Sequence, residues 1–228
     1  MTKHAKACAG ALAAAMLASL AACDGSTKRQ PGPAELALVT QQLDLQLNEP
    51  AQRLHSSLVA ADSDKRIYPE ELVLSADGGP VPVDWWIYQK GWIRLAGVDS
   101  YSRGYFGLTP EGEAFAKTES PRWLESSFQG QPKLTCAGNG GWLSCKVAAT
   151  ASVHATKEGA TLFDAVSVAP VSFEADLQYG PSGWSASDLQ ATDKSDPAAT
   201  ARTAMFGDRD SAYKAHYKWG EAMNRRVR

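Results

Sequence analysis

Two runs of alternating apolar and polar residues in the second half of the chain constrain its fold most. Apolar side chains occur at every second position of 143–153 and of 171–179. Because neighbouring side chains of a strand point to opposite faces, each run predicts a strand with one buried and one wetted face. The Gly-Pro-Ser-Gly segment 180–183 predicts a hairpin turn into a further strand from Trp184. Pro170 precedes the second run and predicts a bulge, an edge or a break there.

A pair of cysteines indicates how this sheet begins. Cys136 and Cys145 flank the Gly-Asn-Gly-Gly segment 138–141, which is typical of a tight turn, and 134–137 is the strand predicted before it. We therefore expect a disulfide across a hairpin, formed in an oxidising compartment. A redox-active pair is the alternative, although such pairs favour a closer Cys-x-x-Cys spacing. The sheet is predicted to be antiparallel, with about four strands.

Helical periodicity governs much of the remaining chain. Apolar residues at helical spacing predict a helix at 34–48, although alternation at 43–47 would also fit a strand. A second short helix is predicted after Pro50, and a C-terminal helix from about Asp196. The apolar stripe of this last helix consists of Ala212, His216, Trp219 and Met223. No internal repeat is visible in the sequence.

The segment 84–116 contains a helix ending at Gly91, two short strands around the loop 97–104, and a helix start at Thr109. It resembles the end of a winged-helix domain, and the resemblance implies a shape rather than DNA binding. An ordinary helix–hairpin–helix unit is the alternative. The predicted fold class is α+β, with a helical N-terminal half that includes a small β-wing, an antiparallel sheet and a C-terminal helix.

The N-terminus has the form of an export signal. Two lysines, Lys3 and Lys6, precede the apolar run 7–22, which is shorter than the roughly 20 residues of a membrane-spanning helix. The four residues Leu20-Ala21-Ala22-Cys23 resemble the lipobox of bacterial lipoproteins. The resemblance implies cleavage before Cys23 and a lipid on its sulfur, with acyl chains such as palmitate. A plain secretory signal is the alternative.

These signals predict the organisation and the location of the chain. The predicted parts are a signal peptide (1–22), a lipidated N-terminus with a flexible tether (23–33), a helical region with the β-wing (34–120) and a β region with the C-terminal helix (121–228). Whether the last two form one domain or two is left open. We expect a lipid-anchored domain that faces the periplasm. Asp24 after the lipidated cysteine favours the inner membrane in some bacteria, so the choice of membrane stays open.

Few residue patterns point to chemistry. The histidines His55, His154 and His216 are far apart in the sequence, and neither a metal nor a cofactor is predicted. Glu174 and Asp176 share the wetted face of one predicted strand, about 7 Å apart, where paired carboxylates could serve a hydrolase. The chain has 25 acidic and 23 basic residues, and this balance argues against a nucleic-acid partner.

Aromatic residues gather in the predicted wing region, either as core or as a surface for a protein partner. They are Trp85, Trp86, Tyr88, Trp92, Tyr101 and Tyr105. The leading functional prediction is a non-catalytic envelope lipoprotein that binds a protein, as an immunity or inhibitor protein or as an accessory subunit of an envelope assembly. The alternatives are an envelope or peptidoglycan hydrolase and a carrier of lipid or a small ligand. The basic C-terminal helix would contact anionic lipid or simply face solvent.

Overall fold

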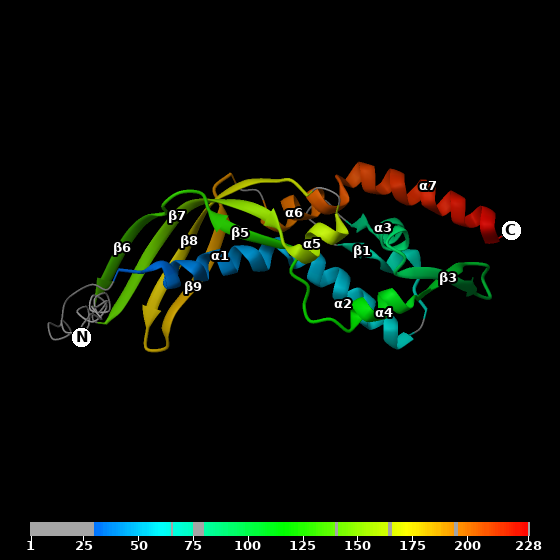
Figure 1. Ribbon diagram of the computed structural model, residues 1–228, viewed down its shortest axis with the longest axis horizontal. Helices are drawn as coiled ribbons and strands as arrows, with labels where there is room; N and C mark the ends of the chain where they lie inside the picture. Colours follow the sequence, from blue (N-terminus) through cyan, green and yellow to red (C-terminus); the bar gives the residue numbers. More distant parts are fainter. Residues whose placement is uncertain are drawn as a thin grey trace, which may run out of the picture. The chain divides into compact units, whose positions relative to one another are not determined.

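The structure is a computed structural model, and its described parts contain both helices and antiparallel sheets. The described residues are 30–64, 66–74, 80–139, 141–163, 166–193 and 196–227. The predicted signal peptide and Cys23 lie outside them. The predicted α+β class is confirmed, including the antiparallel pairing and the C-terminal helix (Figure 1). Among the helices in these ranges, none is long and apolar enough to cross a membrane.

The largest sheet has five strands, in the order β5-β7-β8-β9, with β6 beside the first part of β7. Its strands are β5 (Leu124–Phe128), β6 (Lys133–Asn139), β7 (Trp142–Ala155), β8 (Val168–Gly180) and β9 (Gly183–Ala191). About four strands were predicted, and β5 is the additional one. It pairs with the second half of β7 and is mostly polar, Leu-Glu-Ser-Ser-Phe, so its apolar signal is weak.

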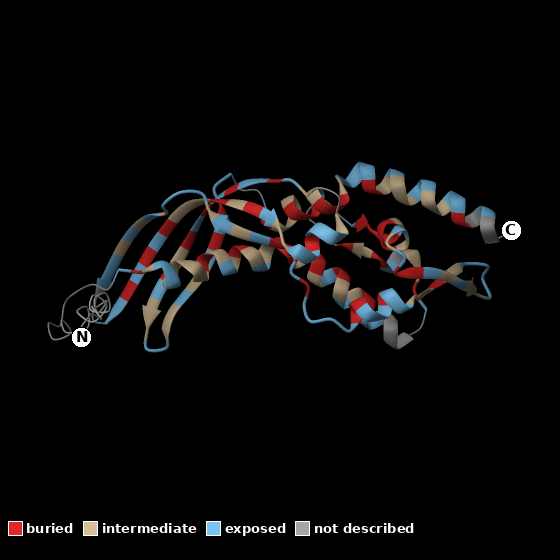
Figure 2. Ribbon diagram, viewed as in Figure 1, coloured by how far each residue is buried: buried red, intermediate tan, exposed pale blue. Residues whose placement is uncertain are grey.

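The cross-strand details of this sheet agree with the sequence. Cys136 pairs directly with Cys145, and the two form the predicted disulfide. The burial of β7 and β8 alternates along most of each strand, so one face is buried and the other is wetted (Figure 2). The register between these strands shifts opposite Pro170, where a bulge was one of the predicted outcomes.

Helix α1 (Pro33–Leu47) covers the buried face of the sheet. Its fully buried residues Val39, Leu43 and Leu47 are spaced at four-residue intervals, which places them on one side of a helix. The helix prediction for 34–48 is therefore confirmed, and the alternative strand at 43–47 is wrong. Full burial of three such side chains contributes about 2 kcal/mol each.

Two polar side chains, Asp44 and Asn48, hydrogen-bond the end of α1 to the edge strand β5. The Asp44 carboxylate accepts hydrogen bonds from the Ser126 amide at 2.7 Å and the Ser126 hydroxyl at 2.6 Å. The buried Asn48 side chain accepts from the amides of Trp123 and Leu124 and donates to the Leu124 carbonyl. These side chains satisfy backbone groups on the strand that would otherwise be unpaired, which sets the position of the helix along the sheet.

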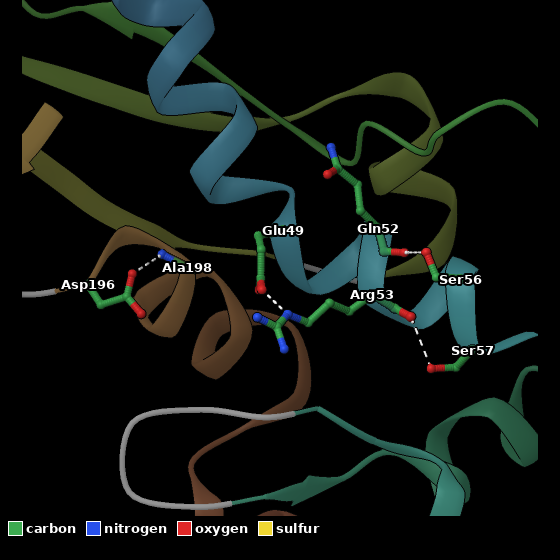
Figure 3. A network of polar contacts seen from close by, with 7 residues as sticks. All are labelled: Glu49, Gln52, Arg53, Ser56, Ser57, Asp196 and Ala198. Carbon is green, nitrogen blue, oxygen red and sulfur yellow. Dashed lines mark hydrogen bonds and ion pairs between the residues drawn. The ribbon is translucent and has the colours of Figure 1, made fainter. Parts of the chain in front are cut away.

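Helix α2 (Glu49–Asp64) follows α1 directly and confirms the second predicted helix. Its exposed face carries the Arg53–Glu49 ion pair, and the hydroxyls of Ser56 and Ser57 donate to carbonyls one turn earlier (Figure 3). The start of α6 (Pro197–Phe206) lies beside it, where the Asp196 side chain accepts from the Ala198 amide. This local hydrogen bonding is typical of helix caps and solvated helix faces.

The wing region follows the predicted order of helix, hairpin and helix. Its elements are α3 (Asp84–Gln89), β3 (Ile93–Val98), β4 (Gly104–Leu108) and α4 (Pro110–Ala116). Gly91, with φ of 73°, lies just after α3 and reverses the chain into β3, as expected of a helix-ending glycine. Before α3, the 3-10 turn η1 (Pro69–Glu71) leads into a small sheet of β1 (Val73–Leu74) and β2 (Val81–Pro82).

A local motif occurs twice: a threonine caps a helix, and the glycine three residues later lies close to a tryptophan carbonyl. Thr109 caps α4, donates its amide to the Trp92 carbonyl and accepts from the Gly112 amide. A Cβ added at Gly112 would lie 2.1 Å from the Trp92 carbonyl oxygen, so only glycine fits there. Thr156 and Gly159 repeat this arrangement on Trp123 at the start of α5 (Lys157–Leu162), with the same 2.1 Å approach.

The two motifs bring their tryptophans to one aromatic core. Trp86 on α3 lies with its ring centroid 5.5 Å from Trp92 and 6.0 Å from Trp123. Phe115 stacks on Trp92 at 4.2 Å, and Phe206 of α6 meets Trp86 edge-on at 5.1 Å. Aromatic pairs in these geometries add about 1 kcal/mol each beyond the area they bury. The buried hydrophobic cluster is continuous from α1 to the C-terminal helix.

The predicted C-terminal helix is divided. Gly207, with φ of 82°, separates α6 from α7 (Arg209–Val227). Helix α7 packs on α3 and β2 through its predicted stripe, in which Ala212 and Met223 are buried. His216 and Trp219 are half-buried between them, so the predicted face of the helix is confirmed.

Candidate functional site

The tip of the β3–β4 hairpin is the most exposed aromatic feature among the described residues. Tyr101 is 80% exposed and Val98 is 45% exposed. Figure 2 shows the turn as exposed, in pale blue, beyond the buried core that surrounds α3. Tyrosine is enriched in protein interfaces relative to the rest of the surface, so an exposed tyrosine on this turn is a candidate for contact with a partner. We call Arg66, Tyr68, Tyr101, Arg103 and Tyr105 the wing-tip surface.

Asp99 holds the turn in one conformation. Its Oδ1 accepts hydrogen bonds from the amides of Tyr101 at 2.9 Å and Arg103 at 2.8 Å. Its Oδ2 accepts from Arg103 Nε at 2.9 Å, and the Asp99 amide donates to the Arg103 carbonyl at 2.8 Å. The backbone hydrogen bond from Arg103, followed by that from Tyr101, lowers the pKa of Asp99 below its ordinary value. The carboxylate is thus ionised at neutral pH and orders the turn.

Arginine and tyrosine side chains alternate across this surface. The Arg103 guanidinium lies 4.8 Å from the ring centroid of Tyr68 and 5.7 Å from that of Tyr101. The Arg66 guanidinium lies 5.0 Å from the ring of Tyr105. Each contact is a cation–π interaction worth about 0.5–1 kcal/mol at an exposed site. The stacking holds long side chains in defined positions, so less side-chain entropy is lost when a partner binds.

A short extended segment completes the wing-tip surface from outside the hairpin. Ile67 exchanges two backbone hydrogen bonds of 2.8 Å with Phe106 of β4, which places the segment 66–68 beside the wing. Ile67 is buried, and its neighbours Arg66 and Tyr68 reach the wing-tip surface. The segment thus lies beside β4 as a third extended segment of the wing, and it supplies two of the five residues of the wing-tip surface.

The structure separates the six aromatic residues that the sequence grouped. Trp86 is 5% exposed and Trp92 is 7% exposed, so both belong to the core and not to a partner surface. Trp85 and Tyr88 are half-buried and pack against the same core. Only Tyr101 and Tyr105 of the predicted set belong to the wing-tip surface.

Sequence reasoning missed Arg66 and Tyr68 as members of this surface, and it did not connect Arg103 with the tyrosines. The only signal for the first two is the short triplet Arg-Ile-Tyr at 66–68, with one aliphatic residue at its centre. Three residues are too few to predict a strand. The signal for Asp99 is its place at the start of a five-residue turn, where a carboxylate commonly accepts amide hydrogen bonds.

The two carboxylates predicted for a hydrolase lie on the wetted face of the large sheet. Glu174 and Asp176 line a hollow of about 370 Å³, together with Lys146 and Asp188. Asp176 pairs with Lys146 across the strands, and Asp188 belongs to a β-bulge of β9, with φ of 51°. The structure therefore adds a third carboxylate and a lysine to the predicted pair.

The three histidines occupy separate places. His55 lies on α2 against Phe115, His154 is exposed on β7, and His216 Nδ1 contacts the Asp84 carboxylate at 2.7 Å. Within the described ranges, no three His, Cys, Asp or Glu side chains are grouped in a way that would hold a metal ion.

No protein-family model, curated protein or solved structure matches the chain.

Proposed function

We propose that this chain is a bacterial envelope lipoprotein, anchored through Cys23, whose folded part binds a protein partner through the wing-tip surface. One observation carries the proposal. Tyr101 is 80% exposed on a turn that four hydrogen bonds between Asp99 and the residues Tyr101 and Arg103 hold in place. The function would be that of an inhibitor or immunity protein, or of an accessory subunit in an envelope assembly.

The composition of the surface favours a protein partner. Tyrosine and arginine are enriched among the residues that dominate binding energy in protein interfaces, because they combine large apolar area with hydrogen-bonding groups. Tyr101 and Arg103 meet this description and are already ordered by Asp99 and Tyr68. Each side chain that is ordered before binding saves about 0.5–1.5 kcal/mol of ordering entropy.

The proposed location comes from the N-terminus. A basic start, an apolar run and the lipobox-like Leu20-Ala21-Ala22-Cys23 favour export and lipid attachment. The disulfide between Cys136 and Cys145 is consistent with an oxidising compartment. A partner of the wing-tip surface would accordingly be a protein exposed to the periplasm.

Capture from the envelope tests the binding proposal. The mature chain, purified from its own membranes, serves as bait for detergent-solubilised envelope proteins, and Tyr101→Ala is compared with Tyr217→Ala. Tyr217 is a suitable control because it is a 66% exposed tyrosine on α7, outside the wing-tip surface. We expect a partner that the wild type and Tyr217→Ala retain in equal amount and that Tyr101→Ala loses. Equal retention by all three proteins would contradict the proposal.

A hydrolase is the second candidate, because Glu174, Asp176 and Asp188 gather around one hollow beside Lys146. The arrangement is also what a solvated sheet face would show, so we rank it below the binding proposal. Peptidoglycan digestion by the Glu174→Ala, Asp176→Ala double variant distinguishes the two. Activity in the wild type that the double variant loses would favour the hydrolase, and unchanged activity would remove these carboxylates from consideration. The carrier alternative has less support, because α1 packs on the face of the sheet that would enclose a ligand.

A further inference from the structure

One end of the large sheet is free of charged residues. No Asp, Glu, Lys, Arg or His occurs in 134–145 or in 177–187, although 21% of the chain is charged. These two segments form the ends of β6 and β7 and of β8 and β9, where each pair of strands turns back. An end without charges can lose its water at little electrostatic cost.

The two hairpins lie side by side and carry aromatic side chains. Leu143 pairs with Tyr179, which brings the β6–β7 turn next to the β8–β9 turn. Trp142 is 60% exposed, and its ring crosses Gly180, since a Cβ added there would lie 2.5 Å from the indole. On the other face, Trp184 lies 5.3 Å from Tyr179, centroid to centroid. We call Trp142, Tyr179, Trp184 and the turn 180–183 the sheet-end surface.

Helix α1 starts toward the sheet-end surface. Asp44 contacts Ser126, whereas Asn48, one turn later, contacts Leu124, so α1 and β5 run in opposite directions. Because β5 is antiparallel to β7, the start of α1 points toward the first residue of β7, which is Trp142 (Figure 1).

The chain before α1 is long enough to bring Cys23 level with this end. Helix α1 rises about 22 Å over its length, while β7 extends about 43 Å from Ala155 to Trp142. The start of α1 therefore lies about 20 Å short of Trp142 along the direction of β7. The segment from Cys23 to Pro33 can extend over about 33–36 Å. A lipid on Cys23 and the ring of Trp142 can therefore meet the same bilayer surface.

We propose that the sheet-end surface rests in the interfacial layer of the bilayer that holds the lipid anchor. This inference rests on the proposed attachment at Cys23. Tryptophan and tyrosine favour the interfacial layer, where the ring contacts acyl chains and the polar atom contacts water and headgroups. Contact of this end with the bilayer would fix the orientation of the domain, with the sheet-end surface as the membrane-facing side.

Tryptophan quenching by brominated lipid tests the contact. The mature lipidated chain is reconstituted into vesicles of phosphatidylethanolamine and phosphatidylglycerol, with and without bromine on the acyl chains. We expect brominated lipid to quench the wild-type fluorescence and Trp142→Phe to lose about half of that quenching, because Trp142 and Trp184 are the two indoles of this end. Trp219→Phe on α7 should keep the quenching. Equal quenching of wild type and Trp142→Phe would overturn the inference.

A second variant avoids any dependence on the indole itself. Ser182 is exposed in the β8–β9 turn, and Ser182→Asp adds one charge to the sheet-end surface. We expect it to reduce quenching, because the charge must then be brought toward lipid, whereas Ser56→Asp on the exposed face of α2 should not. An unchanged signal in Ser182→Asp would contradict the proposed contact.

The mass of the N-terminal peptide separates this inference from the proposal on which it rests. An acylated Cys23 without quenching at Trp142 would overturn the membrane contact and leave the anchor intact. An unmodified Cys23 would overturn the anchor and with it the reason for placing this end at a bilayer.

Discussion

The imidazole of His216 hydrogen-bonds to the carboxylate of Asp84, with 2.7 Å between Nδ1 and Oδ2. The contact joins α7 to the first residue of α3, across 132 positions of the sequence. Asp84 is fully buried, and its Oδ1 accepts from the Trp85 amide at 2.8 Å. Burial raises the pKa of Asp84 above its ordinary value, while the charge of His216 acts in the opposite direction.

Removal of the imidazole should destabilise the protein. In His216→Ala, the buried Asp84 loses its side-chain partner, and we expect the free energy of unfolding to fall by about 2–3 kcal/mol. Asp84→Asn removes the carboxylate that the histidine contacts, so the double variant should lose less than the sum of the single losses. Urea unfolding of the four proteins measures this coupling. Strict additivity would show that the contact contributes nothing.

The raised pKa of Asp84 predicts a pH dependence of definite sign. The ordinary pKa of an aspartate in an unfolded chain is about 3.9. Between that value and its higher pKa in the fold, the folded state binds more protons than the unfolded state, so the contribution of Asp84 to stability falls as pH rises. We expect the stability of Asp84→Asn relative to wild type to improve as pH rises from about 4. Urea unfolding at several pH values checks this, and a change in the opposite direction would contradict it.

The two threonine-capped motifs predict that Gly112 and Gly159 do not tolerate a side chain. An added Cβ would lie 2.1 Å from the carbonyl oxygen of Trp92 or Trp123, so each Gly→Ala variant should lose about 2–3 kcal/mol. Gly220 in α7 is the matched control, because no atom beyond its own helix backbone and chain neighbours lies within 4 Å of its added Cβ. Gly220→Ala should be neutral or stabilise the helix by about 0.5–1 kcal/mol. Thermal unfolding measures the stability of the three variants. Similar changes at the three positions would show that Gly112 and Gly159 are not required by close contact with the tryptophan carbonyls.

The disulfide predicts a dependence on reductant. Cys136 and Cys145 are nine positions apart, and closing a loop of this size stabilises a fold by about 2–3 kcal/mol. Dithiothreitol should therefore lower the urea midpoint of the wild type, and it should not change that of the Cys136→Ser, Cys145→Ser variant. An effect of the same size on both proteins would show that the reductant acts elsewhere.

The sequence predicted those helices, strands and turns that are determined by residues close together in the chain. The alternation of 143–153 and 171–179, the turn between the cysteines and the Thr109 cap all determine their structure within a few residues. Strand β5 was missed because Asp44 of α1 and Asn48 just after it, about 80 positions away, stabilise a segment with little apolar signal of its own. The sequence Thr-x-Glu-Gly occurs at 109–112 and at 156–159. The sequence alone does not predict that the two copies contact Trp92 and Trp123.

The candidate site was predicted less completely, for the same reason. The sequence grouped the aromatic residues by proximity along the chain, but Trp86 and Trp92 are buried in the core, whereas Tyr101 is exposed. Burial of a particular side chain depends on which distant segments cover it. Tyr68 reaches the wing-tip surface because Ile67 pairs with Phe106 through backbone hydrogen bonds, and no local sequence pattern predicts this pairing.

Crosslinking from position 101 in intact cells tests the proposed binding most directly. A photoreactive phenylalanine replaces Tyr101 in one strain and Tyr217 in another, since both tyrosines are exposed and lie on different elements. We expect one discrete crosslinked protein from position 101 and none from position 217. The absence of a product at 101, or the same product at both positions, would contradict a protein-binding role for the wing-tip surface.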